Sequence, residues 1–135
     1  MTRFVLDASV VMAWCFEEEG GPDTDAILDR LDDGVALVPQ VWSFEIANVL
    51  AAAERRGRIT ADQSERFIQF LRPLPITIDG TVSELSELLS ATRASRLTAY
   101  DAAYLALSIA HRLPLATRDR AQAKAARQAG VELLP

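Results

Sequence analysis

The sequence predicts an α/β fold, with a mostly parallel central sheet between two layers of helices, that is, a three-layer α/β/α arrangement. Short, fully apolar runs of the kind found in buried parallel strands alternate with longer segments that carry helix start and stop signals. The chain has 135 residues, of which 50% are hydrophobic, and this is enough for one well-buried core. We therefore expect a single domain over residues 1–135.

The first half of the chain is expected to hold two strands and three helices. Ser9 can cap a helix after the first strand, and Pro22 suits the first turn of the next one. Gly57 suits the position just after the third helix. In order, we expect a strand at residues 4–6, a helix at 10–16, a loop at 17–22, a helix at 22–33, a strand at 35–38 and a helix at 41–56.

The second half continues the alternation. Thr60 and Thr98 can each begin a helix. Pro114 and Gly130 follow positions where helices are expected to end. In order, we expect a helix at residues 60–72, a strand at 75–78, a helix at 81–95 with Leu85, Leu88 and Leu89 on one face, a helix at 98–111, a strand at 115–116, a helix at 118–129 and a strand at 131–134.

The cysteine and histidine counts exclude several kinds of chemistry. One Cys cannot form an internal disulfide, and one Cys with one His cannot build a Cys/His zinc site. A single His also excludes mechanisms that need two histidines. If the chain is a hydrolase, its expected working groups are carboxylates and a metal ion.

The net charge of −5 is unevenly distributed. Residues 1–33 hold two basic and nine acidic side chains, whereas the other 102 residues hold 12 basic and 10 acidic ones. A polyanion would therefore need a local basic patch or bridging cations. No apolar run approaches the ~18 residues of a membrane span, and the first run meets Asp7 after three apolar residues. We expect neither a signal peptide nor a membrane partner, and we expect the chain to be cytoplasmic.

Four acidic residues follow predicted strands or lie early in predicted helices. Asp7 follows the first strand, and Asp119 comes shortly after the strand at residues 115–116, in the first turn of the next helix. Glu45 lies on a mostly apolar stripe of its helix, so its side chain is expected to point into the protein. Asp101 stands three residues after Thr98, in the first turn of its helix.

Taken singly, each of these acids has an ordinary structural explanation. Asp7 could cap a turn or a helix, and Glu45 could pair with an arginine. Asp101 could complete a capping box with Thr98, and Asp119 could interact with the helix dipole.

Taken together, the four acids predict a metal site. The carboxyl ends of parallel strands gather at one edge of a doubly wound sheet, so these side chains are expected to converge there. Four like charges would repel one another, and a divalent cation removes that repulsion. Because all the ligands are oxygens, Mg²⁺ or Mn²⁺ fits better than zinc.

Four sequence fragments in this order carry a family resemblance. They are residues 4–9 (FVLDAS), the stretch from Val38-Pro39 to the segment EIANVL at 45–50, residues 97–107 (LTAYDAAYLAL) and residues 114–119 (PLATRD). The set resembles the PIN-domain ribonucleases, and most closely the VapC-type toxins of bacterial toxin–antitoxin pairs. It runs through essentially the whole chain and implies one PIN domain with a PIN-like three-layer fold.

The resemblance implies a Mg²⁺-dependent endoribonuclease, with Mn²⁺ as an alternative to Mg²⁺. Asp7, Glu45, Asp101 and Asp119 match the family's catalytic acids; Asp7 and Asp101 would bind the metal directly, and Glu45 and Asp119 would complete the cluster, partly through water. Metal-activated water would attack the phosphodiester and leave a 5′-phosphate and a 3′-hydroxyl.

Two supporting residues and the partners follow from the same resemblance, and two arginines are considered from the sequence alone. Ser9 and Thr117 match hydroxyl residues that support the acids by hydrogen bonding. Arg118 and Arg120 flank Asp119 and could bind phosphate or simply be exposed. The implied partners are an RNA substrate, a cognate antitoxin protein and a second copy of the chain in a homodimer.

Two other functions stay open at this point. A PIN domain that is not a toxin could process RNA or act as a non-catalytic scaffold. An aspartyl-phosphate phosphatase would use Asp7 as its nucleophile, but such enzymes usually carry a second Asp two residues on, where this chain has Ser9.

Overall fold

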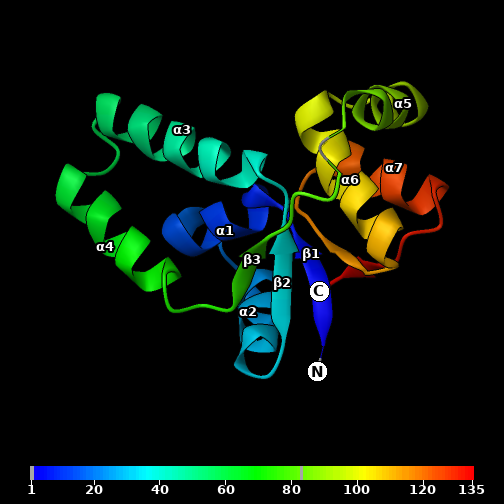
Figure 1. The fold of residues 1–135 in the computed structure, drawn as a ribbon. Coiled ribbons are helices and arrows are strands. Elements are labelled where there is room, and N and C mark those ends of the chain that lie inside the picture. The colour runs from blue at the N-terminus through cyan, green and yellow to red at the C-terminus, as the bar shows by residue number, and fades with distance from the viewer. Residues whose placement is uncertain (1, 83) are drawn as a thin grey trace.

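The computed structural model describes residues 2–82 and 84–135 and has the predicted three-layer α/β/α fold (Figure 1). Within these residues, no helix combines the length and the apolar character needed to cross a membrane. The elements, in order, are β1 (Arg3–Leu6), α1 (Ala8–Cys15), the 3-10 turn η1 (Glu17–Glu19), α2 (Pro22–Asp29), the 3-10 turn η2 (Arg30–Asp32), β2 (Val35–Val38), α3 (Val41–Arg55), α4 (Ala61–Leu71), β3 (Ile76–Ile78), α5 (Leu85–Ser95), α6 (Ala99–His111), β4 (Leu115–Ala116), α7 (Arg120–Gln128) and β5 (Leu133–Leu134).

The sheet was predicted to be mostly parallel, and all four strand pairs among the described residues are parallel, with the strand order β3-β2-β1-β4-β5. The chain adds β2 and β3 on one side of β1 and then crosses to add β4 and β5 on the other. The direction of winding therefore reverses between β1 and β4. In open parallel sheets this switch point, beyond the carboxyl ends of the strands, is where ligands bind.

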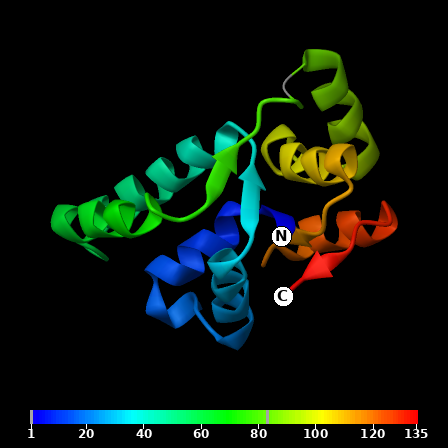
Figure 2. The same cartoon turned by 60° about the horizontal axis from the view of Figure 1, so that its bottom comes forward.

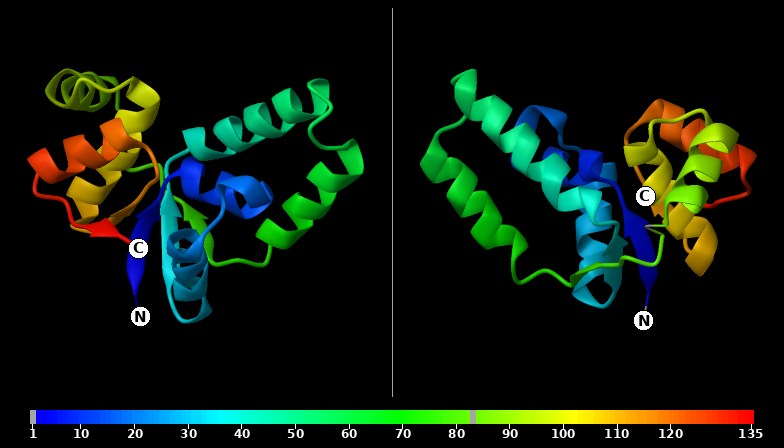
Figure 3. Two further views of the ribbon diagram at one scale, coloured as in Figure 1. Left: turned by 180° about the vertical axis from the view of Figure 1, so that it is seen from behind. Right: turned by 45° about the horizontal axis from the view of Figure 1, so that its top comes forward.

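The two faces of the sheet carry separate halves of the core. Along β1, Phe4 and Leu6 pack with residues of α1 to α4, while Val5 packs on the opposite face with residues of α6 and α7. This alternation is the period of two expected of a strand covered on both sides. Figures 2 and 3 show the same division, with α3 and α4 on one side of the sheet and α5, α6 and α7 together on the other.

Several helix boundaries follow the predicted signals. Thr60 caps α4 through a reciprocal pair of bonds: its Oγ1 accepts from the Gln63 backbone N–H (3.1 Å), and the Gln63 side chain accepts from the Thr60 N–H (2.8 Å). Gly57 and Gly130 follow α3 and α7 with φ of +70° and +77°. Glycine adopts this left-handed conformation without steric penalty, which explains why the two helices end there.

Two helix starts differ from the prediction because an aspartate provides the cap. Helix α1 begins at Ala8 rather than at residue 10, and Asp7, not Ser9, is its cap. Helix α7 begins at Arg120, and Asp119, predicted to lie in the first turn, is the cap that precedes it. Aspartate is as effective as serine at an N-cap, and both aspartates have the extended backbone that this position requires.

Other differences are local. The predicted helix at 22–33 divides into α2 and η2, because the Arg30 N–H donates to three successive carbonyls and tightens the last turn. The predicted loop at 17–22 contains the 3-10 turn η1, and the last strand is shorter than 131–134. Helix α5 begins at Leu85 instead of residue 81, since Asp79 accepts a bond from the Thr81 N–H (2.8 Å) and holds a turn there. Residue 83 lies outside the described residues.

The predicted leucine face of α5 does not become core. Leu85 is 78% exposed and Leu89 is 45% exposed. Helix α5 packs on α6, on the outside of the second helical layer, so one layer of helix already separates it from the sheet.

Candidate active site

The two strands at the switch point bring Asp7 and Thr117 together. Asp7 follows β1 and Thr117 follows β4, and the Asp7 backbone N–H donates to the Ala116 carbonyl at 2.9 Å. Thr117 Oγ1 then donates to Asp7 Oδ2 at 3.1 Å. Residues 110 positions apart in sequence are thus joined at the carboxyl edge of the sheet.

Asp7 is the most buried of the four acids, with 4% of its surface exposed. Its Oδ2 accepts bonds from Ser9 Oγ (2.5 Å), from the Ser9 backbone N–H (3.2 Å) and from Thr117 Oγ1 (3.1 Å). Burial raises the pKa of Asp7 above 3.8; the bonds from Ser9 and Thr117 act in the opposite direction, and the charge of Asp119 adds to the rise. The hydrogen bonds predicted for Ser9 and Thr117 are therefore present, and they fix the orientation of the buried Asp7 carboxylate.

The same two hydroxyls also hold the loop after β4. Ser9 Oγ accepts from the Arg118 backbone N–H (2.9 Å), and Thr117 Oγ1 accepts from the Asp119 N–H (3.0 Å). Each hydroxyl donates to Asp7 and accepts from this loop, so the loop and Asp7 are positioned together. This double use explains why small hydroxyl residues stand at both positions.

Asp101 and Asp119 lie at the starts of α6 and α7. Thr98 caps α6, and its Oγ1 accepts from the Asp101 N–H at 3.3 Å; the return bond from the Thr98 N–H to the Asp101 side chain that would complete a capping box is absent among the described residues. Burial raises the pKa of Asp101, and the charges of Asp7 and Asp119 raise it further. Asp119 Oδ1 accepts a hydrogen bond from the Gln122 N–H at 2.9 Å and so caps α7. The charge of Asp119 also raises the pKa values of Asp7 and Asp101.

Glu45 reaches the site from α3, but for a different reason than predicted. The buried residues of α3 are Ile46, Leu50 and Ala53, so the stripe that carries Glu45 lies beside the core and not in it. Glu45 is half-buried, and its Oε1 accepts a bond from the Tyr104 hydroxyl at 2.6 Å. Burial raises the pKa of Glu45, the bond from Tyr104 opposes this, and the charges of Asp7 and Asp101 add to it.

Sequence reasoning missed two residues that position the acids. Tyr104 on α6 is fully buried, and burial together with its bond to Glu45 raises the pKa of its hydroxyl, which stays protonated. Gln122 on α7 is also fully buried, and its Nε2 donates to the Asp101 backbone carbonyl at 3.0 Å. At both positions a polar residue stands on an otherwise apolar face of its helix, and this pattern could have identified Tyr104 and Gln122 from the sequence.

The four acids thus influence one another, and none of them has a cationic partner within the described residues. The ion pairs within residues 2–82 and 84–135 join Arg58 to Glu18 and Glu19, His111 to Asp79, and Arg118 to Glu19. Among the described residues, Glu45 therefore does not pair with an arginine, the partner considered above, and its partner is the Tyr104 hydroxyl.

The donor chemistry of this cluster fits a hard divalent cation. All four side chains offer carboxylate oxygens, and a shared positive charge would lower the raised pKa values of Asp7, Glu45 and Asp101. In the part of the chain that the structure describes, however, no three acidic, histidine or cysteine side chains form a ready-made ligand group. Binding of an ion by these side chains would require them to move closer together.

The two arginines beside Asp119 differ in their surroundings. The Arg118 side chain is paired with Glu19 at 3.4 Å, and its backbone N–H is bound by Ser9. Arg120 is exposed in the first turn of α7. Both are adjacent in sequence to Asp119, the acid that caps α7.

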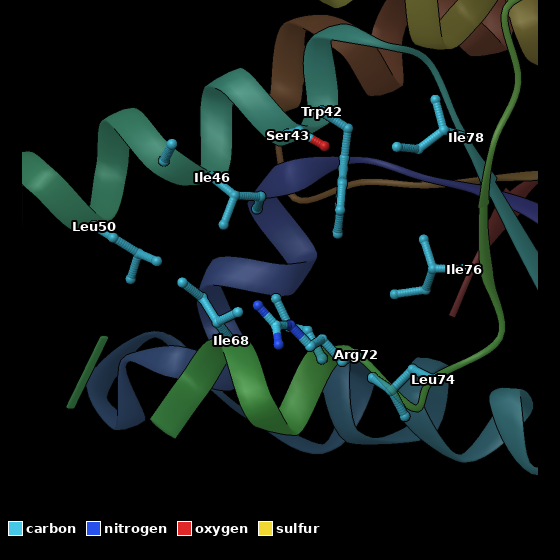
Figure 4. A pocket seen from close by; sticks show the side chains of 11 residues that line it. Trp42, Ser43, Ile46, Leu50, Ile68, Arg72, Leu74, Ile76 and Ile78 are labelled. Carbon is cyan, nitrogen blue, oxygen red and sulfur yellow. The ribbon is translucent and has the colours of Figure 1, made fainter. Parts of the chain in front are cut away.

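An apolar groove lies between α3, α4 and β3 (Figure 4). It encloses about 320 Å³, and Arg72 is the one charged residue among the described residues that line it. The indole N–H of Trp42, a residue of this groove, is buried with no acceptor among the described residues. The other lining residues are Ser43, Ile46, Ala47, Leu50, Ile68, Leu71, Leu74, Ile76 and Ile78.

Comparison with known proteins identifies one family and several similar folds. The PIN domain model matches residues 4–128. The structure is similar to PAE2754 from Pyrobaculum aerophilum, at 24% identity over 92% of this chain and 79% of that chain, with a TM-score of 0.70. It is similar to VapBC2 from Rickettsia felis, solved with a DNA fragment from the promoter, at 13% identity over 98% and 97% of the two chains, with a TM-score of 0.68. A toxin–antitoxin complex from Klebsiella pneumoniae matches at 19% identity over 86% of each chain, with a TM-score of 0.60. Comparison with curated proteins gives no match.

Proposed function

The chain belongs to the PIN domain family, and we propose from this premise that it is a Mg²⁺-dependent endoribonuclease that acts as the toxin of a toxin–antitoxin pair. The family match supports a nuclease. The similarity to a toxin–antitoxin complex supports the pairing with an antitoxin. Mn²⁺ is the expected alternative ion, because it accepts the same oxygen ligands.

The observation that carries this proposal is a set of four carboxylates that have no cationic partner among the described residues and whose charges act on one another. Asp7, Glu45, Asp101 and Asp119 come from four separate elements, and burial or mutual repulsion raises the pKa of three of them. A stable fold has no need of such a cluster. A divalent cation would neutralise it and would also let an acidic protein of net charge −5 bind a phosphodiester.

The four acids would divide the work by their surroundings. Asp7 and Asp101 are assigned as direct metal ligands, and Glu45 and Asp119 would complete the cluster, partly through water. The bound ion would supply activated water and would neutralise charge on the reacting phosphate. Tyr104 donates to Oε1 of Glu45, which leaves Oε2 of that carboxyl without a hydrogen bond among the described residues and able to accept one from water.

The neighbouring basic residues would help to hold the RNA. Arg120 is exposed at the start of α7 and is assigned to a substrate phosphate. Arg118 is paired with Glu19, so it would have to exchange that weak surface pair for phosphate.

The apolar groove of Figure 4 is assigned to a segment of the antitoxin. Ile78, one of its lining residues, is 52% exposed, and the Trp42 N–H can donate to a carbonyl of a bound segment. Co-expression with the product of an adjacent open reading frame should yield a complex, Ile78→Asp should weaken it, and the exposed control Leu85→Asp should not. We also expect a homodimer, which sedimentation velocity would measure.

RNA cleavage by the purified chain tests the central proposal. Cleavage should require Mg²⁺ or Mn²⁺, chelator should stop it, and Asp7→Asn should abolish it while the far-UV spectrum is unchanged. The matched control Asp33→Asn removes an exposed aspartate and should cleave like wild type. A phosphorylated Asp7 would instead indicate a phosphatase, and metal binding without cleavage of any RNA would indicate a scaffold.

A further inference from the structure

Two exposed aromatic residues stand directly beside acids of the cluster. Phe44 precedes Glu45 on α3, and Tyr100 precedes Asp101 on α6. Phe44 is 71% exposed and Tyr100 is 64% exposed, which is unusual for such large apolar surfaces. The rings come from helices on opposite faces of the sheet, yet they line one cavity together.

This cavity, which we name the α3–α6 hollow, has a volume of about 560 Å³. It is lined by Val41, Phe44, Glu45, Asn48, Val49 and Tyr100. Its size lies within the range of sites that hold small organic groups. Its walls combine two aromatic rings with the amide of Asn48, which can both donate and accept hydrogen bonds. One of its lining residues, Glu45, belongs to the acidic cluster, so the hollow adjoins the place of cleavage.

A nucleobase matches these walls. It is planar and stacks on aromatic rings without regard to its identity, and its edge can bond to an amide. Tyr100 and Val41 also line a second cavity of about 250 Å³, so Tyr100 borders two hollows. In a duplex the bases are already stacked and paired, and only an unpaired base can enter such a site.

We propose that Phe44 and Tyr100 stack on unpaired bases next to the cleaved phosphate and thereby hold the RNA strand in the α3–α6 hollow. This inference rests on the proposed ribonuclease function. A second copy of the chain is a poorer occupant, because covering the hollow with protein would also bury the Glu45 carboxylate. Within the described residues, Glu45 has one hydrogen-bond partner, Tyr104, and no cation, so that burial would be unfavourable.

Binding of a fluorescein-labelled 12-nucleotide RNA of mixed sequence tests the proposal. Anisotropy would be measured on the full chain with Ca²⁺ in place of Mg²⁺, and gels would verify that the strand stays intact. Phe44→Ala and Tyr100→Ala should each weaken binding at least about fivefold, the lower end for losing one stacked base. Phe44→Trp and Tyr100→Phe keep a ring and should bind within about twofold of wild type.

Two controls separate stacking from other losses. Phe70→Ala removes another exposed ring, on α4 and outside the hollow, and should leave binding unchanged. A strand of the same length without bases should bind wild type and Phe44→Ala equally well. The complementary duplex should likewise bind both proteins equally, because its bases cannot reach the rings.

Three results would overturn the proposal. If wild type binds and cleaves single strands and the two alanine variants do the same, stacking is refuted and the ribonuclease function stands. If wild type neither binds nor cleaves any RNA, both proposals fail. If the alanine variants change only the sedimentation coefficient, the hollow is an interface between copies of the chain.

Discussion

Replacing Asp7 by asparagine should stabilise the metal-free protein. Asp7 is 4% exposed, has no cationic partner among the described residues and lies close enough to Asp119 for that charge to raise its pKa. An asparagine at this position would keep the shape of the side chain, and its carbonyl could still accept from Ser9 and Thr117. The substitution therefore removes a buried charge while it leaves the packing in place.

The expected gain is about 1–3 kcal/mol near pH 8. An incompletely paired buried ion carries an effective penalty of several kcal/mol, and the stronger hydrogen bonds that a carboxylate accepts offset part of it. For a domain of 135 residues, each kcal/mol shifts the Tm by roughly 3–5 °C. The Asp7→Asn protein should thus melt at least about 3 °C above wild type in chelator.

The gain should depend on pH with a definite sign. The folded-state pKa of Asp7 is raised above 3.8, so the folded wild type binds this proton more tightly than the unfolded chain does. Wild type therefore loses stability as the pH rises from about 3.8 through the folded-state pKa, and the variant lacks this loss. The difference between the two proteins should be large near pH 8 and small near pH 4.

Urea unfolding at both pH values, with chelator present, measures this difference. Asp33→Asn, which removes an exposed aspartate, should show no comparable gain. Mg²⁺ should raise the Tm of wild type more than that of Asp7→Asn, because only wild type keeps the full ligand set. A variant that is less stable than wild type near pH 8, or a gain that is equal near pH 4, would refute the crowding of charge around Asp7.

Three further substitutions test the residues that hold the acids. Tyr104→Phe deletes a hydrogen bond to a charged group, so it should lower the free energy of unfolding by about 1–3 kcal/mol, measured by urea unfolding. It should also raise the pKa of Glu45 further, because the bond from Tyr104 lowers that pKa, and NMR titration would measure this shift. Gln122→Met should change the free energy of unfolding by less than about 1 kcal/mol. The lost bond to the Asp101 carbonyl is balanced by removal of the buried Oε1, which has no partner among the described residues. RNA cleavage should nevertheless fall, and full activity would argue against a positioning role for Gln122. Thr98→Ala should lower stability by about 1 kcal/mol through loss of the α6 cap, measured by urea unfolding, and an unchanged midpoint would contradict this assignment.

Elements framed by local signals were the most predictable part of the fold. The short apolar strands, the Thr60 capping box and the glycines after α3 and α7 depend on neighbours within a few residues, so their signals are complete in the sequence. The cap of α1 was placed two residues late, since Asp7 and Ser9 are equally good caps and only the end of β1 distinguishes them.

Glu45 shows where reasoning from one helix fails. Its stripe on α3 was expected to be buried, but Asn48 and Val49 on that stripe are exposed and the core contacts lie on the adjacent stripe. The acid still reaches the site, because α6 brings Tyr104 against it from the other side of the sheet. A helical period identifies a face, but the packing of the whole molecule decides what covers that face.

The sequence by itself determined the alternation of strands and helices, the parallel sheet and the identity of the acids, since these depend on short-range patterns and on residue chemistry. The tertiary structure alone decided which side chains stand around those acids: Tyr104 against Glu45, Gln122 against Asp101, and two aromatic rings across one hollow. These pairs join residues from about 20 to 60 positions apart. Such contacts form only when the strand order brings distant helices to the same edge of the sheet, and no local pattern in the chain encodes that distance.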